Sequence, residues 1–314
     1  MENHRIRARP LVMLLCLATL AAILVSEAAR AQIRVEVSLV NVFATVRDKK
    51  KAIVGGLTQE DFRIYEDGQP QEISNFAAES TLPVTLGLLI DTSGSETDFL
   101  AAEQQAASQF LARVLRKNDL AMVVTFDTGV DLLANFTGDR ATLDRAIRRA
   151  QINTGGSGTI MTPGPFPQIT GGGTNFFDAI YLAAHDKLAG EAGRKALVIL
   201  TDAQDTGSKM SLQNAVDAAQ RTDTVIHILL VGMGNQGVAK KLAEETGGRV
   251  ISVRSQKNLE QAFDQISEEL RHQYTIAYSS SNKTRDGGYR EIKVETANKD
   301  YSVLARRGYY APRN

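Results

Sequence analysis

Three short stretches, far apart in the chain, carry carboxylate and hydroxyl side chains in an arrangement that could bind a metal ion. The first is Asp91-Thr92-Ser93-Gly94-Ser95, the second is Thr174 after three glycines, and the third is Asp202. The two carboxylates and three hydroxyls are hard oxygen donors, with neither His nor Cys among them. Such a set suits Mg²⁺, Mn²⁺ or Ca²⁺ rather than Zn²⁺.

An apolar run precedes each of the two aspartates. Residues 84–90 come directly before Asp91, and residues 196–200 come shortly before Asp202. Both runs predict fully buried parallel strands, so each aspartate is expected just past the carboxyl end of a strand. Open α/β sheets bind their ligands at that edge, so the topology predicts a ligand site beside the two aspartates.

The segment 82–270 alternates strand and helix patterns. This alternation predicts an α/β domain with a doubly wound, mainly parallel sheet that is covered on both faces. The strands are expected at 84–90, 121–126, 130–136, 196–200, 224–231 and 249–253. The helices are expected at 99–115, 141–150, 175–188, 211–221, 238–245 and 259–269.

The two ends of the chain have a β pattern instead. In residues 32–81, apolar residues alternate with polar ones and Asp67-Gly68 predicts a hairpin. Residues 271–314 alternate in the same way, for example at Tyr274, Ile276 and Tyr278. Each end alone has too few strands for a stable core. We therefore expect both ends to form one small β-sandwich, with the α/β domain inserted between them.

The order and placement of the candidate ligands resemble a known family. Asp91-x-Ser93-x-Ser95, Thr174 and Asp202 resemble the metal-ion-dependent adhesion site of von Willebrand factor A domains, over roughly residues 82–269. The resemblance implies that the two serines and the threonine give hydroxyl ligands and that the aspartates bind directly or through water. It also implies an open coordination position, which an acidic group of a partner protein fills.

The architecture narrows this resemblance further. With its closing residues 305–310, the chain resembles a group of secreted bacterial von Willebrand A-related proteins named for acidobacteria. Two positions depart from the family pattern: Glu96 stands where Met is frequent, and Ala203 where Gly is usual. Glu96, Asp98 and Asp205 are expected to add negative charge beside the ion, which would strengthen cation binding and weaken an acidic ligand.

Residues 1–31 read as a secretory signal peptide. Three arginines precede the apolar run 11–25, and Ala29-Arg30-Ala31 fits a cleavage site after Ala31. This predicts a secreted or periplasmic protein, with membrane attachment only if the segment stays uncleaved. Cys16 is the single cysteine and lies inside this segment, so the mature chain would contain no disulfide.

Composition excludes some function classes. Hydrophobic residues make up 43% of the chain, and without residues 1–31 the formal net charge is −2. No broad basic surface for nucleic acid is therefore expected. Residues 232–237 fit G-x-G-x-x-G, but no acidic residue follows at the spacing that would hold a ribose. We interpret them as a strand-to-helix turn and expect no nucleotide.

Segment 153–173 is an unusually long loop that leads to Thr174. It is either a specificity loop beside the metal or a tolerated surface insertion, and both interpretations stay open.

These features favour a non-enzymatic module in which a divalent cation bridges to a carboxylate of a partner protein. One alternative is a Mg²⁺-dependent hydrolase or phosphotransfer enzyme, with Glu96, Asp98 or Asp205 as base. The other is a structural envelope protein in which the metal site is vestigial.

Overall fold

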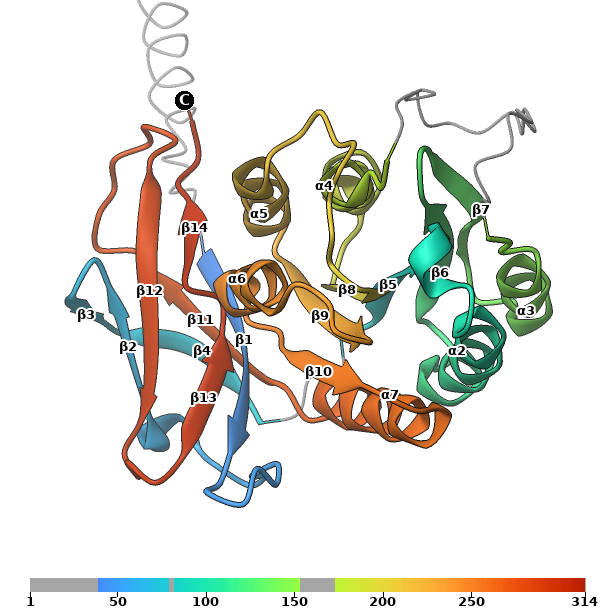
Figure 1. Cartoon of the computed structure of the whole chain (residues 1–314). Helices are drawn as coiled ribbons and strands as arrows, with labels where there is room; N and C mark the ends of the chain where they lie inside the picture. Colours follow the sequence, from blue (N-terminus) through green and yellow to red (C-terminus); the bar gives the residue numbers. More distant parts are fainter. Residues whose placement is uncertain (1–38, 79–81, 153–172, 314) are drawn as a thin grey trace, which may run out of the picture. The chain divides into compact units, whose positions relative to one another are not determined.

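The computed structural model describes residues 39–78, 82–152 and 173–313 of the 314-residue chain. The predicted signal peptide and nearly all of loop 153–173 lie outside these ranges. Within them the chain forms a six-stranded sheet of order β10-β9-β8-β5-β6-β7 and two four-stranded sheets (Figure 1). Among the described helices, none is long and apolar enough to cross a membrane.

The six-stranded sheet is mainly parallel. Strand β5 (Val84–Asp91) lies between β8 (Arg194–Thr201) and β6 (Leu120–Phe126) and is parallel to both. All of its residues are buried, as the continuous apolar run predicts for a central strand with both faces covered. On one side, β9 (Thr224–Val231) and β10 (Val250–Val253) extend the parallel order, and on the other side β7 (Val130–Thr137) pairs antiparallel with β6.

Helices cover both faces of this sheet. Helices α2, α3 and α7 pack on one face, where Leu86 and Leu88 of β5 meet Phe110 and Phe263, whose rings are 4.6 Å apart. Helices α4, α5 and α6 pack on the other face with Leu89 (Figure 1). The predicted doubly wound α/β fold is confirmed. The helix bounds are α2 (Leu100–Val114), α3 (Arg140–Arg148), α4 (Phe176–Tyr181), α5 (Leu212–Arg221), α6 (Gln236–Thr246) and α7 (Gln256–Arg271).

Several helices differ from their expected bounds, and α7 begins three residues earlier than expected. The helix expected at 175–188 is regular only in α4, continues as a π-helix (Leu182–Lys187) and ends in a 3₁₀ turn (Leu188–Gly190). Helix α6 begins two residues before the expected 238, because the Asn235 side chain accepts a hydrogen bond from the backbone N–H of Val238 and caps the first turn.

The two ends of the described chain share sheets. Strand β1 (Leu39–Arg47) pairs antiparallel with β11 (Tyr274–Ser279) and with β13 (Ser302–Ala305). In the other small sheet, β12 (Tyr289–Thr296) pairs with β2 (Phe62–Glu66). The expected pairing of N-terminal with C-terminal strands is therefore observed. The boundaries 32–81, 82–270 and 271–314 stay a prediction.

The Asp67-Gly68 hairpin has an unexpected second arm. Residues 67 and 68 both have positive φ and connect β2 to the short strand β3 (Gln69–Gln71). The chain then changes sheet, because β4 (Ile73–Ala77) pairs with β11 instead of β2. The remaining strand β14 (Gly308–Tyr310) pairs with β12. Buried side chains of both sheets, including Phe62 and Tyr274, form one core between them.

A buried carboxylate on α7 links the β-rich part to the α/β part. Glu269 is 1% exposed and accepts hydrogen bonds from the guanidinium groups of Arg47 in β1 and Arg249 beside β10. His227 in β9 lies 3.6 Å from the same carboxylate, and burial lowers the pKa of this imidazole. The chain thus supplies two cationic side chains to this one buried acid.

Candidate metal centre

Asp91 is the last residue of β5 and is completely buried. Its carboxylate accepts a hydrogen bond of 3.0 Å from the backbone N–H of Ser93 and one of 2.6 Å from the hydroxyl of Thr201. Burial raises the pKa of Asp91 to about 6, although these hydrogen bonds act in the opposite direction. Thr201 was not among the predicted site residues. The strand register accounts for this contact: Ile90 pairs with Leu200, so the residues that follow them, Asp91 and Thr201, lie side by side.

The turn after Asp91 presents the two predicted serines to solvent. The Thr92 backbone N–H bonds the carbonyl of Phe126 at the end of β6, and a 3₁₀ turn (Gly94–Glu96) follows. The Ser93 and Ser95 hydroxyl oxygens are 3.0 Å apart. Ser95 is exposed and Ser93 is half-buried. The spacing x-Ser-x-Ser therefore brings both hydroxyls together, as expected.

Asp202 follows directly after β8 and is half-buried. The backbone N–H of Gln204 donates a 3.0 Å hydrogen bond to its carboxylate. Ala203 has a φ of 57°, in the left-handed region where glycine costs least. Ala203 therefore adopts, at some cost in strain, a backbone conformation that the usual Gly would adopt freely.

A neighbouring turn also determines the position of Asp202. The backbone N–H of Asn235 donates a 2.7 Å hydrogen bond to the Asp202 carbonyl. A Cβ on Gly234 would lie 2.2 Å from that same carbonyl, so only glycine permits the approach. The G-x-G-x-x-G segment is the strand-to-helix turn that we expected, between β9 and α6. Its contact with Asp202 could not be recognised from the motif.

Thr174 is held against the loop that follows Asp202. Its backbone N–H donates a 2.9 Å hydrogen bond to the Thr206 hydroxyl, and its carbonyl accepts from the backbone N–H groups of Thr206 and Gly207 at 3.1 Å. Gly173 has a φ of 116° and a Cβ there would meet Thr206. These contacts tie two of the three predicted stretches together through their backbones. The assignment of all five side chains as ligands stays a prediction.

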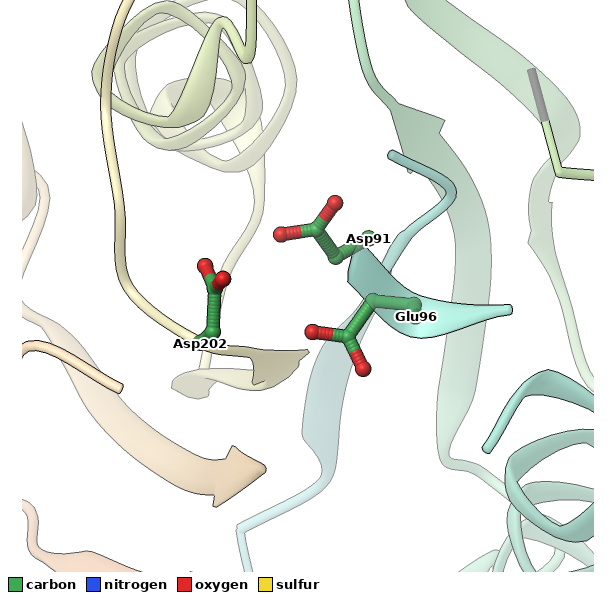
Figure 2. A group of neighbouring side chains, drawn as sticks. All are labelled: Asp91, Glu96 and Asp202. Carbon is green, nitrogen blue, oxygen red and sulfur yellow. The ribbon is translucent and has the colours of Figure 1, made fainter. Parts of the chain in front are cut away.

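A third carboxylate joins the two aspartates. One oxygen each of Asp91, Glu96 and Asp202 lies within 4.8 Å of the others. Figure 2 shows the carboxylates of Asp91 and Glu96 turned toward Asp202. Glu96 is 1% exposed, and its Oε2 has no hydrogen-bond partner. Burial raises the pKa of Glu96 to about 8, and the nearby Asp91 and Asp202 act in the same direction. From the sequence, we expected Glu96 beside the ion, as added negative charge or as a base, but did not include it among the predicted ligands.

Glu103 on α2 is a further buried acid near Asp91 and Glu96. It is completely buried, and neither of its carboxylate oxygens has a hydrogen-bond partner. Burial raises its pKa to about 9, with further contributions from Glu96 and Asp91. Glu103 does not belong to the group of three converging carboxylates.

This donor set fits a divalent metal ion. Within the described ranges, none of the three converging carboxylates forms an ion pair with Lys, Arg or His. Buried acids without a cationic partner are costly, and a bound cation offsets that cost. Oxygens on opposite sides of one Mg²⁺ are about 4 Å apart, and those around Ca²⁺ are about 5 Å apart. Asp91, Glu96 and Asp202 can therefore share one such ion.

The other acids considered from the sequence have different surroundings. Asp98 is exposed. Asp205 accepts hydrogen bonds from the backbone N–H of Phe177 at 3.1 Å and from the Ser208 hydroxyl, so it holds the start of α4 in place.

Comparison with protein families supports the assignment of the fold. Residues 86–208 match the family model described as von Willebrand factor type A domain. A calcium-activated chloride channel regulator 1 from Bos taurus is 26% identical over 190 residues. That match covers 57% of this chain and only 18% of the regulator. The chain thus spans less than a fifth of the length of that curated relative.

Solved structures share the fold at low sequence identity. A von Willebrand factor type A protein from Catenulispora acidiphila is 11% identical, with a TM-score of 0.51 over 90% of this chain and 76% of its own. Proximal thread matrix protein 1 from the mussel byssus, in a form with zinc in its metal-ion-dependent adhesion site, is 14% identical. Its TM-score is 0.51 over 65% of this chain and 49% of its own. The predicted von Willebrand factor A domain is confirmed for residues 86–208, whereas the narrower bacterial group stays a prediction.

Proposed function

Because residues 86–208 form a von Willebrand factor type A domain, we propose that this protein is a metal-dependent protein-binding module. A divalent cation at the carboxyl edge of the sheet would bridge to a carboxylate of a partner protein. The observation that carries the proposal is the convergence of Asp91, Glu96 and Asp202 within 4.8 Å, with no cationic partner in the described chain.

The arrangement of the hydroxyl groups supports a bridging role. Asp91 and Glu96 lie on the buried side of the site, whereas Ser95 is exposed and Ser93 is half-buried. An ion held between them would keep one side toward solvent, where a partner can reach it. Ser93, Ser95, Thr174 and Asp202 are the proposed ligands on this side, together with the buried Asp91. Mg²⁺ is the proposed ion, with Mn²⁺ and Ca²⁺ as further candidates of the same oxygen-binding chemistry.

The relatives support the same class of function. Their printed names describe a matrix protein and a channel regulator, and a mussel relative has a metal-occupied adhesion site. We propose that the present protein acts outside the cytoplasm, secreted or periplasmic, because of its predicted signal peptide.

The enzymatic alternative would need a solvent-facing base beside the ion. Glu96 is buried, and Asp205 is engaged by Phe177 and Ser208. Asp98 is exposed, but it is not part of the converging group. These observations favour the binding function over hydrolysis or phosphoryl transfer.

The first test is a calorimetric titration of Mg²⁺ and Mn²⁺ into the protein and into its Asp91→Ala, Ser93→Ala variant. We expect saturable binding at one site in the protein and none in the variant. Equal binding in both would overturn the site. An absence of binding to the protein, together with unchanged thermal stability on adding the ion, would instead support a vestigial site, because an ion bound only by the folded state must stabilise it.

The second test concerns the open coordination position. Acetate and acetamide are titrated into the Mn²⁺-loaded protein, and the broadening of their methyl proton lines is followed by NMR. For acetate, we expect more broadening with the unmodified protein than with Asp91→Ala. For acetamide, we expect no such difference, because only the carboxylate is charged. Equal behaviour of the two probes would contradict the bridging role.

A further inference from the structure

Glu96 is the buried carboxylate that the family pattern does not account for. Its backbone lies in the 3₁₀ turn Gly94–Glu96, which points the side chain inward, whereas the preceding Ser95 faces solvent. The Glu96 carboxylate lies beside that of Asp202, one of the proposed ligands. Its Oε2 has no partner and is fully buried.

We propose that Glu96 is a direct metal ligand that adds a third carboxylate to the ion from the buried side of the site. This inference rests on the proposed function, because it concerns the same ion. Two observations carry it independently of one another: one Glu96 oxygen lies within 4.8 Å of oxygens of Asp91 and Asp202, and the buried Oε2 lacks a hydrogen-bond partner.

A third carboxylate changes the charge of the loaded site. Two carboxylates neutralise a divalent ion, whereas three leave a net charge of −1 at the centre. The ion is then held more tightly by the protein itself, with less need for a partner to complete its shell. A partner carboxylate meets a site that is already negative, so its binding is weakened. Glu96 therefore acts in opposite directions on the ion and on the acidic partner.

Direct ligation can be distinguished from a distant charge effect. In Glu96→Gln the side chain keeps its shape and loses its charge. In Glu96→Asp the charge remains, but the carboxylate is one methylene shorter and withdraws from the ion. If Glu96 is a ligand, both variants bind the ion more weakly. If Glu96 contributes only its charge, Glu96→Gln binds the ion more weakly and Glu96→Asp keeps its affinity.

Glu103→Gln is the matched control. Glu103 is as deeply buried as Glu96, its oxygens also lack partners, and it lies outside the converging group. Any general effect of removing a buried acid near the site therefore appears in this variant as well.

The experiment uses Mn²⁺ alone as the probe, with two readouts. Affinity is measured by calorimetry, and the number of water molecules on bound Mn²⁺ is measured by ¹⁷O relaxation of water. For Glu96→Gln and Glu96→Asp we expect affinity to fall about 10- to 100-fold and bound Mn²⁺ to gain one water. Glu103→Gln should match the unmodified protein in both readouts. Circular dichroism verifies that each variant is folded.

The outcomes separate the two proposals. If Glu96→Gln keeps the Mn²⁺ affinity and the number of Mn²⁺-bound waters of the unmodified protein, the role of Glu96 is overturned and the metal site itself remains. Normal affinity in Glu96→Asp alone would likewise overturn direct ligation. If the folded, unmodified protein does not bind Mn²⁺ at all, the proposed function itself fails. As a further readout, acetate should bind more tightly to Mn²⁺-loaded Glu96→Gln than to the loaded unmodified protein, and weaker binding would contradict the charge argument.

Discussion

Two regions of this molecule bury acidic side chains, and they differ in what compensates the charge. On α7, Glu269 is 1% exposed and is paired with Arg47 and Arg249. At the carboxyl edge of the sheet, Asp91 and Glu96 are buried to the same extent, and the described chain gives them no cationic partner. The first region supplies its own cations. The second would need a cation from solution, which is what distinguishes a structural ion pair from a candidate metal site.

The regions also differ in how the acids are positioned. Arginine side chains hold Glu269 in place from β1 and from the end of the loop before β10. At the sheet edge, backbone groups and one hydroxyl hold the acids in place: the N–H of Ser93 and the hydroxyl of Thr201 donate hydrogen bonds to Asp91, and the turn at Gly234 contacts Asp202. Mutations should therefore affect folding in the first region and ion binding in the second.

The largest effect on stability is expected from Glu269→Gln. It leaves two arginines without their buried counter-charge, and breaking a buried pair from one side typically costs about 3 to 5 kcal/mol. Urea unfolding in EDTA at neutral pH measures the loss. Glu268→Gln, at the exposed neighbouring position, is the control. A similar small loss in both variants would mean that the ion pairs contribute little.

Glu103→Gln should stabilise the protein instead of destabilising it. The pKa of Glu103 is raised to about 9 in the folded protein, from 4.5. Its contribution to stability is therefore fully present below pH 4.5 and is lost as the pH rises toward 9. Compared with the unmodified protein in EDTA, the variant should gain about 1 to 3 kcal/mol at pH 8 and little at pH 4.5.

Urea unfolding at several pH values tests this trend, with Glu72→Gln on the exposed surface as control. A gain that does not depend on pH would show that the benefit arises from packing and not from the buried charge.

Burial raises the pKa of Asp91 and Glu96 in the same direction, so added Mn²⁺ should stabilise the protein more at pH 8 than at pH 5.

Gly234→Ala tests whether the backbone turn positions Asp202. The added Cβ would collide with the Asp202 carbonyl at 2.2 Å, so either the turn or Asp202 must move. We expect Mn²⁺ affinity to fall about tenfold, as is usual when a group that supports a ligand is disturbed. Gly237→Ala is the control in the same motif, because its Cβ would meet only Asn235 at 3.6 Å. Equal affinities in the two variants would contradict the role of this turn.

The smallest effect is expected from Arg249→Gln. The Arg249 side chain is 20% exposed, and Glu269 keeps its second partner Arg47. We expect a loss of about 1 kcal/mol in urea unfolding, near the upper end for partly exposed pairs. A loss as large as that of Glu269→Gln would show that Arg249 is the dominant partner, and the comparison between the two regions would then rest on this one pair.

The sequence was sufficient for the elements that depend on long patterns. The buried runs before Asp91 and Asp202 predicted two parallel strands, and in the structure these strands pair directly and bring both carboxylates to one edge. Glu96 was harder to place, because a three-residue turn determines whether its side chain faces solvent or the ion. Gly234 was read correctly as a turn residue, but its contact partner is 32 positions away and no local motif encodes that contact.

The shared sheets of the two chain ends have a consequence for biosynthesis. Tyr274 of β11 bonds the carbonyl of Val54 across a sequence separation of 220 residues. At ordinary rates of translation, roughly 10 to 40 seconds pass between the appearance of these two residues. During that time β1, β2 and β4 have open edges, whereas most of the central domain is already available to fold. Newly made chains are therefore most exposed to strand-mediated aggregation before strands β11 to β14 have been synthesised.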